Sequence, residues 1–182
     1  MLIEILLIIV RFILLVTLQV VVLDNVQLSY FINPYLYVLF ILLLPINMPR
    51  GLVLIIALIL GFVVGAPTNT SGIHGAACVF IGYMRPFVLK LIAPREGYES
   101  DAKPTMREMG LNWFFSYAAI MVFLHHTVLF FLEVFRLSEF FTTIMRIVVS
   151  SLFTLAFIMI SVYLFYKPKG QRDGSNITQA QS

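Results

Sequence analysis

The chain has 182 residues, of which 60% are hydrophobic and 12% charged, and its mean hydropathy is +0.98. These values exclude an ordinary soluble domain, argue against catalysis in water, and indicate a polytopic integral membrane protein. The net charge of +3 comes from basic residues that stand mostly at segment ends, so it does not indicate nucleic-acid binding, and the one cysteine cannot form an internal disulfide.

Apolar segments predict six transmembrane helices in one all-α bundle, because about 20 helical residues cross the hydrocarbon core. The predicted spans are residues 2–23, 31–46, 52–66, 73–93, 111–132 and 140–166. They form one transmembrane domain, 1–166, followed by a disordered cytoplasmic tail, 167–182. The first span has no basic leader or cleavage site, so we expect it to be retained.

Basic residues set the predicted orientation of the bundle. Arg50, the hydrophilic loop 94–110 and the lysines of the tail would face one side of the membrane, and Arg136 the other. Because basic loops favour the cytoplasm, we predict that both termini are cytoplasmic and that the polar turn 67–71 lies on the outer side.

The first two spans each carry an unusual feature. Glu4 and Arg11 lie seven residues apart, on nearly the same helix face, and Arg11 is close to mid-span, where an unpaired cation is costly. Three interpretations are open. The two residues form a structural pair, the arginine extends to the cytoplasmic headgroups, or it contacts a substrate. The second span is short, which leaves a small tilt, an interfacial helix or an extension from Tyr30 as alternatives.

A tight hairpin is predicted between the third and fourth spans. The small-residue spacings Gly61 with Gly65 and Gly72 with Ala76 are typical of helices whose backbones approach closely in a membrane. A polar turn containing Asn69 lies between them. We expect leucine at Gly72 to disturb the hairpin, because the larger side chain would block close approach.

A polar stripe is predicted on the fourth span. If this helix starts near Gly72, its period places His74, Cys78 and Arg85 within about 40° of one another. The stripe is either a ligand-binding site in a cavity or a set of capping and interhelical contacts. Pro86 would kink the helix or mark its approach to the cytoplasmic face.

The last two spans hold the remaining intramembrane polar residues. His125 and His126 point about 100° apart, which does not suit chelation from one helix, so hydrogen bonds to a neighbouring helix are favoured over a proton or metal site. Glu133 follows near the end of that span. Arg146 either lines a polar path or extends outward. Without a nucleophile elbow, phosphate loop or zinc motif, we predict no catalytic, cofactor-binding or metal-binding residues.

Several motifs occur in order and at fitting distances in the six-span frame. They are Asn33-Pro-Tyr-Leu-Tyr37, Pro45, Pro49-Arg50, Asn69-Thr70-x-Gly72-x-His74-x-Ala76-Ala77, Arg85-Pro86, and Leu124-His125-His126 followed by Phe130-Phe-Leu-Glu133. Together they resemble the family of the rod shape-determining membrane protein MreD, particularly its Bacteroidetes-type forms. Gly65 stands where the family often has an aspartate, so no role of that carboxylate carries over.

The resemblance implies a non-enzymatic, multi-pass subunit of the bacterial cell inner membrane. Such subunits belong to the cell-elongation complex, or elongasome, which determines cell shape through peptidoglycan synthesis, and they need no cofactor. The implied partners are MreC and, through it, the MreB filament, RodA and a penicillin-binding transpeptidase. The subunit would act as a scaffold within the lipid bilayer.

The same resemblance supplies an alternative function. The family's fold is similar to that of the S components of energy-coupling-factor transporters, which implies a substrate-binding subunit of a vitamin transporter. A vitamin pocket needs several convergent polar and aromatic groups, whereas a partner groove is mostly apolar. The outer loops are short and sparsely polar, which favours the groove. A membrane enzyme or lipid flippase that uses Arg11, His125 and Arg146 has no supporting motif.

Overall fold

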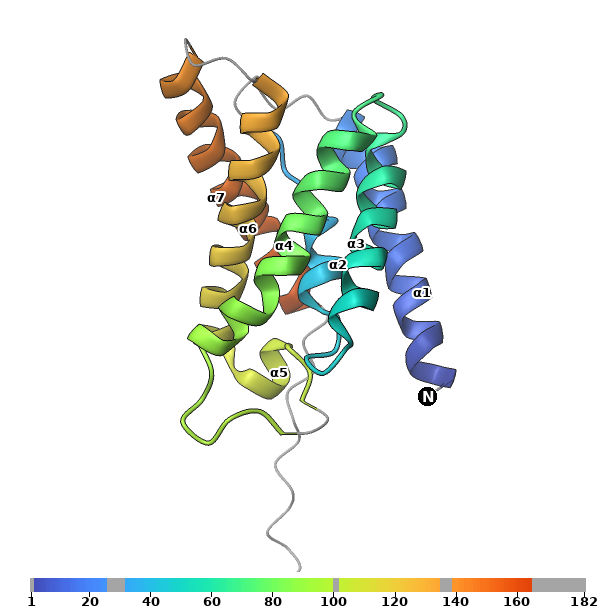
Figure 1. The fold of residues 1–182 in the computed structure, drawn as a ribbon, viewed down its shortest axis with the longest axis vertical. Coiled ribbons are helices and arrows are strands. Elements are labelled where there is room, and N and C mark those ends of the chain that lie inside the picture. The colour runs from blue at the N-terminus through green and yellow to red at the C-terminus, as the bar shows by residue number, and fades with distance from the viewer. Residues whose placement is uncertain (1, 26–31, 100–101, 135–138, 165–182) are drawn as a thin grey trace, which may run out of the picture.

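The computed structural model describes residues 2–25, 32–99, 102–134 and 139–164, in which all regular secondary structure is helical. Long helices stand side by side along the long axis of the molecule (Figure 1). They are α1 (Leu2–Thr17), α3 (Arg50–Gly65), α4 (Ser71–Leu91), α6 (Leu111–Val134) and α7 (Phe140–Leu164). A π-helical turn, Leu18–Val22, and a 3-10 turn, Leu23–Asn25, extend α1. The short α5 (Met106–Met109) lies at the end of the bundle near the N-terminus.

Four helical segments are long and apolar enough to cross a membrane. They are Ile5–Asn25, α4, α6 and α7, whereas α3 is apolar but shorter, with 16 residues. These segments indicate a membrane protein. Six spans and cytoplasmic termini stay predictions, and both Arg136 and the tail 167–182 lie outside the described residues.

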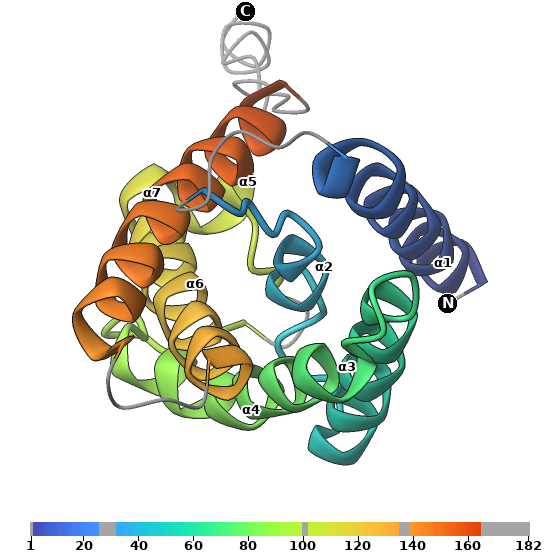
Figure 2. The same cartoon turned by 90° about the horizontal axis from the view of Figure 1, so that it is seen from above.

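The predicted second span, 31–46, differs most from the structure. Its helix, α2, extends only over Val38–Leu42 and lies at the centre of a ring formed by the long helices (Figure 2). Pro34 and Pro45 bracket the helix, and proline opposes helix continuation on either side. All of α2 is buried. Five helical residues are far too few to cross a bilayer, so the helical span predicted over 31–46 is not formed. The run is apolar and surrounded by protein.

Helices α3 and α4 approach each other closely at two glycines of α3. A Cβ atom at Gly61 would lie 2.5 Å from the backbone oxygen of His74, and one at Gly65 would lie 2.7 Å from the Cα of Ser71. Both distances are shorter than any normal contact with a Cβ atom, so the two positions require glycine. The close approach expected from the first small-residue spacing is therefore present.

The expectation for the second spacing is wrong. A Cβ atom at Gly72 would meet nothing within 4 Å, because this first-turn residue of α4 is exposed. Nearby, Asn69 has a φ angle of 56°, a left-handed conformation that asparagine adopts more readily than most residues. The turn thus depends on Asn69, and the interhelical contact depends on Gly61 and Gly65.

The predicted stripe on α4 is buried along its whole length. His74, Cys78 and Arg85 are all covered. Hydrogen bonds from His74 and Arg85 to the central segment, residues 32–45, show that the stripe faces that segment. Helix α4 continues past Pro86 to Leu91.

Candidate functional site

The central segment crosses the interior with largely irregular backbone. In an apolar surrounding each free N–H or C=O group costs several kcal/mol, so these groups need partners inside the protein. The surrounding helices supply these partners from polar side chains. Of the polar residues singled out in the sequence, Arg11 and Arg85 have this role.

The side chain of Gln19 forms hydrogen bonds with the backbone at the beginning of the central segment. Its Oε1 accepts a hydrogen bond from the Leu36 N–H at 2.8 Å, and its Nε2 donates to the Pro34 carbonyl at 3.1 Å. The same Nε2 donates to Asp24 Oδ1 at 2.7 Å. We did not single out Gln19 from the sequence, although an isolated, fully buried glutamine in an apolar span is the kind of residue that needs such partners.

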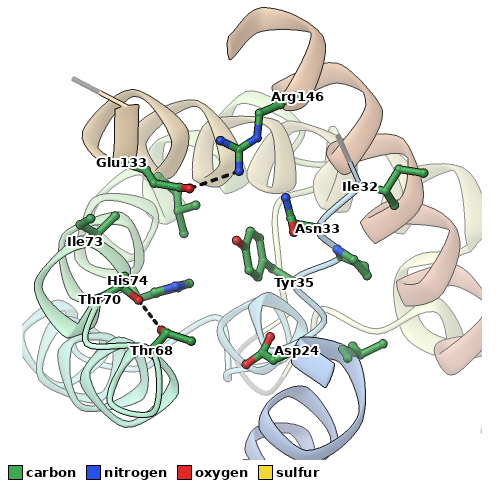
Figure 3. A pocket seen from close by; sticks show the side chains of 13 residues that line it. Asp24, Ile32, Asn33, Tyr35, Thr68, Thr70, Ile73, His74, Glu133 and Arg146 are labelled. Atoms are coloured by element: carbon green, nitrogen blue, oxygen red, sulfur yellow. Dashed lines mark hydrogen bonds and ion pairs between the residues drawn. The ribbon is translucent and has the colours of Figure 1, made fainter. Parts of the chain in front are cut away.

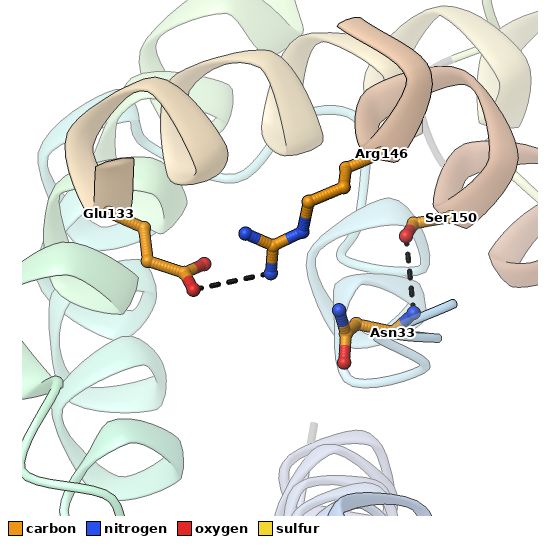
Figure 4. A network of polar contacts seen from close by, with 4 residues as sticks. All are labelled: Asn33, Glu133, Arg146 and Ser150. Carbon is orange, nitrogen blue, oxygen red and sulfur yellow. Dashed lines mark hydrogen bonds and ion pairs between the residues drawn. The ribbon is translucent and has the colours of Figure 1, made fainter. Parts of the chain in front are cut away.

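Hydroxyl groups of α7 bind the same stretch from the other side. The Asn33 N–H donates to Ser150 Oγ at 3.1 Å (Figure 4), and the Tyr35 N–H donates to Thr154 Oγ1 at 3.0 Å. Thr154 Oγ1 also lies 3.1 Å from His126 Nε2. The contacts of Asn33 and Tyr35 join residues more than 110 positions apart in the chain, and they fix the central segment against α7.

The side chain of Arg85 forms hydrogen bonds with the backbone at the end of the central segment. Its guanidinium donates to the carbonyl oxygens of Leu44 and Pro45, the latter at 3.3 Å, and its Nε donates to the Tyr117 hydroxyl at 2.9 Å. The three donors of one rigid fork thereby hold two backbone acceptors and one side chain of α6. Arg85 is thus a structural clamp.

Arg11 has a similar contact from α1. Its Nη1 donates to the Leu43 carbonyl at 3.2 Å. Arg11 therefore faces protein, as its position near mid-span requires. The side chain of Glu4 lies outside the described residues, so the predicted pairing of Glu4 with Arg11 stays a prediction.

Tyr37 joins two histidines at the centre of the bundle. Its hydroxyl lies 2.8 Å from His74 Nδ1 and 2.8 Å from His125 Nε2. His126 is oriented differently, with Nδ1 2.9 Å from the Val122 carbonyl. The two adjacent histidines therefore have separate partners. This arrangement agrees with the predicted hydrogen bonds inside the bundle, in which the two rings do not share one site.

Replacing Tyr37 by phenylalanine is expected to destabilise the protein by about 1–3 kcal/mol, the cost of leaving buried polar groups unbonded. His125 Nδ1 already has no hydrogen-bond partner among the described residues, so its ring would lose its remaining one. Thermal unfolding in detergent measures the change. Tyr83, which is 55% exposed on α4, gives the control substitution Tyr83→Phe, and equal effects at both positions would contradict the role of the Tyr37 hydroxyl.

An ion pair connects the ends of α6 and α7. Arg146 Nη2 lies 3.2 Å from Glu133 Oε1, and the side chains are 8% and 38% exposed (Figure 4). The guanidinium carbon also lies 4.5 Å from the centroid of the Phe130 ring, a cation–π distance. Arg146 therefore points into the bundle and does not extend outward to solvent.

A cavity opens beside this ion pair (Figure 3). It lies where α6 ends and α4 begins, at the end of the bundle opposite α5 (Figure 1). We call it the end cavity, and its volume is about 550 Å³. It is lined by Leu23, Asp24, Ile32, Asn33, Pro34, Tyr35, Thr68, Thr70, Ile73, His74, Leu129, Glu133 and Arg146. Polar groups from six parts of the chain converge there: the turn after α1, the central segment, the α3–α4 turn, α4, α6 and α7. The loops at this end of the bundle, sparsely polar in the sequence, thus contribute to a polar cavity.

The structure divides the predicted site residues among several places. His74, Glu133 and Arg146 line the end cavity, and His125 and His126 lie next to the Tyr35 ring. The remaining predicted residues are elsewhere: Arg11 and Arg85 hold the end of the central segment, Gly61, Gly65, Asn69 and Gly72 belong to the hairpin, and Pro86 lies in the last turns of α4.

Asn33, Tyr35 and Asp24 complete the end cavity, and we did not name them as site residues from the sequence. Within the described residues, no three His, Cys, Asp or Glu side chains are placed to hold a metal ion. The arrangement is suited to binding a small polar molecule. No family model, curated protein or solved structure matches this chain.

Proposed function

We propose that this chain is a non-enzymatic, multi-pass inner-membrane subunit of the bacterial cell-elongation complex, as the resemblance to the MreD family implies. The observation that carries the proposal is the convergence of the resembling motifs. Tyr37 binds His74 and His125, and Arg85 binds Pro45, so motifs scattered over a hundred residues form one buried unit. A set of motifs that meets in space is better support than the same motifs read one by one.

The use of the interior polar groups also supports a scaffold over an enzyme. The histidines, Arg85 and the α7 hydroxyls bind the central segment or one another, and so they fix its path through the bundle. Their chemistry is used for architecture. The proposed activity is therefore the presentation of a rigid membrane surface to partner proteins.

Helix α1 supplies the most accessible apolar surface for such a partner. Only 11% of the candidate span Ile5–Asn25, which α1 and the turns after it form, is buried in the molecule, against 50% for α4 and 44% for α6. A transmembrane helix of an MreC-like partner would pack against this face through close contacts between side chains, since hydrophobicity alone does not drive helix association in lipid.

Crosslinking in native membranes tests this proposal. A photoreactive residue at Ile9, exposed on α1, is expected to capture a single-span membrane protein, which should also co-purify in mild detergent. The same label at Leu15, buried on the same helix, is the control and should capture no partner. Recovery of a monomer that has no membrane partner and binds a vitamin with sub-micromolar affinity would contradict the scaffold function.

The end cavity favours the second candidate, a substrate-binding subunit of a vitamin transporter. Its volume falls within the range of about 300–1,000 Å³ typical of small-molecule sites, and its polar and aromatic groups converge. The co-purification experiment distinguishes the candidates, because a transporter subunit would be recovered with an energising transport module rather than with cell-elongation proteins.

A further inference from the structure

Charged groups lie at two depths in the end cavity. The guanidinium of Arg146 is almost buried, whereas the carboxylates of Asp24 and Glu133 are exposed near the opening. Glu133 is paired with Arg146, and Asp24 accepts its hydrogen bond from the uncharged amide of Gln19. From the interior to the opening, the order of charge is positive and then negative.

Tyr35 stands between these charges (Figure 3). Its ring packs against the rings of His74, His125, His126 and Phe130, with centroid separations of 5.4 Å, 6.0 Å, 5.4 Å and 6.1 Å. This packing holds the side chain rigidly, and none of the described residues forms a hydrogen bond with its hydroxyl. The phenol is thus a fixed polar group of the cavity wall that can donate or accept.

We propose that the end cavity binds a zwitterion, with its anionic group toward Arg146 and its protonated amine toward the carboxylates of Asp24 and Glu133. Hydrogen bonds between ionised groups are about twice as strong as neutral ones, so the two ends would fix the orientation of the ligand. The Tyr35 hydroxyl can donate a hydrogen bond to the anionic group or accept one from the amine. This inference goes beyond the scaffold function and does not depend on it.

Two sources could supply such a ligand. In phosphatidylethanolamine the phosphate lies nearer the hydrocarbon and the amine nearer the water, which is the same order as the charges in the end cavity. The cavity also lies at the end of the spanning helices, where headgroups are found. A free zwitterion, such as an amino acid, carries the same two groups without acyl chains.

Lipid titration of the purified, delipidated full chain tests the proposal by native mass spectrometry. Phosphatidylethanolamine is expected to bind about tenfold more tightly than phosphatidylglycerol, which lacks the amine, a difference of about 1.4 kcal/mol. It should also bind more tightly than phosphatidylcholine, whose quaternary amine has no N–H group to donate. Equal binding of the three lipids would count against a lipid ligand.

Calorimetry with glycerophosphoethanolamine and with glycine supplies the soluble arm of the experiment. Binding in this arm would support the zwitterion site and assign it to a free ligand, whereas preferential binding of the lipid alone would assign it to a headgroup. Absence of lipid selectivity together with absence of soluble binding would overturn the proposal.

Two substitutions locate the site. Asp24→Asn keeps an acceptor for Gln19 but removes the charge, and it is expected to weaken binding of the ethanolamine ligand about tenfold. Thr68→Lys adds a cation at the exposed edge of the cavity and should also weaken it. Glu99→Gln, an exposed carboxylate outside the cavity, is the control and should bind normally. Wild-type affinity in both cavity variants would place the ligand elsewhere.

Discussion

Alanine at Gly61 is expected to lower the accumulation of folded protein strongly, because its Cβ would lie 2.5 Å from one backbone atom of α4 and 2.6 Å from two others. Backbone atoms cannot move aside as the end of a flexible side chain can, so α3 and α4 would have to separate. Overpacking in a core costs about 1–3 kcal/mol and occasionally more. Fluorescence-detected size exclusion of a tagged protein measures the folded fraction.

The matched control for this substitution is alanine at Gly72, a glycine of the second predicted small-residue spacing. A Cβ atom there meets nothing within 4 Å, and alanine favours a helix over glycine by about 0.8–1.0 kcal/mol, so this variant should accumulate normally or better. Similar losses at Gly61 and Gly72 would show that the close approach of α3 to α4 is not what limits folding.

Replacing Arg85 by methionine is expected to have a comparably large effect. Methionine keeps much of the length and apolar character of the side chain but leaves the buried Leu44 carbonyl without its donor, whereas the Pro45 carbonyl retains the Met48 N–H at 3.2 Å. An unbonded buried acceptor costs about 1–3 kcal/mol, and the Tyr117 hydroxyl also loses its partner. A lower midpoint of thermal unfolding in detergent and a smaller folded fraction should both be observed.

Two further variants show whether the charge or the hydrogen-bond geometry of Arg85 is responsible for its effect on stability. Arg85→Lys keeps the charge but not the planar fork, so its stability should fall between those of the wild type and the methionine variant. Lys90→Met removes an exposed cation from the same helix and should leave stability nearly unchanged. A methionine variant at Arg85 as stable as the one at Lys90 would rule out the clamp.

Some features of the site were readable from single residues. Arg11 had to face protein because a cation near mid-span is costly in lipid, and Gly61 with Gly65 predicted a close contact. His125 and His126 pointed in different directions because of the helical period. The partners of these residues were not readable, since the structure joins Tyr37 to His125 across 88 positions and Tyr35 to Thr154 across 119.

The end cavity could not be predicted for the same reason. In the sequence Asp24 directly follows the first apolar run, and the turn from Pro67 to Ser71 contributes few polar groups by itself. Their significance comes from the central segment, which brings Asn33 and Tyr35 beside Glu133 and Arg146. A count of polar residues in each loop cannot detect a site whose wall is a segment inside the bundle.

The sequence by itself determined the membrane class, the long helices and the glycine contact, because apolar length and helical period act locally along the chain. Only the tertiary structure decided that residues 32–45 lie at the centre and that a polar cavity opens at the end. Lipid and protein interior both accept apolar side chains, so hydropathy does not distinguish a span from a buried core segment. The irregular backbone of that segment then required hydrogen-bond donors and acceptors from helices distant in the chain.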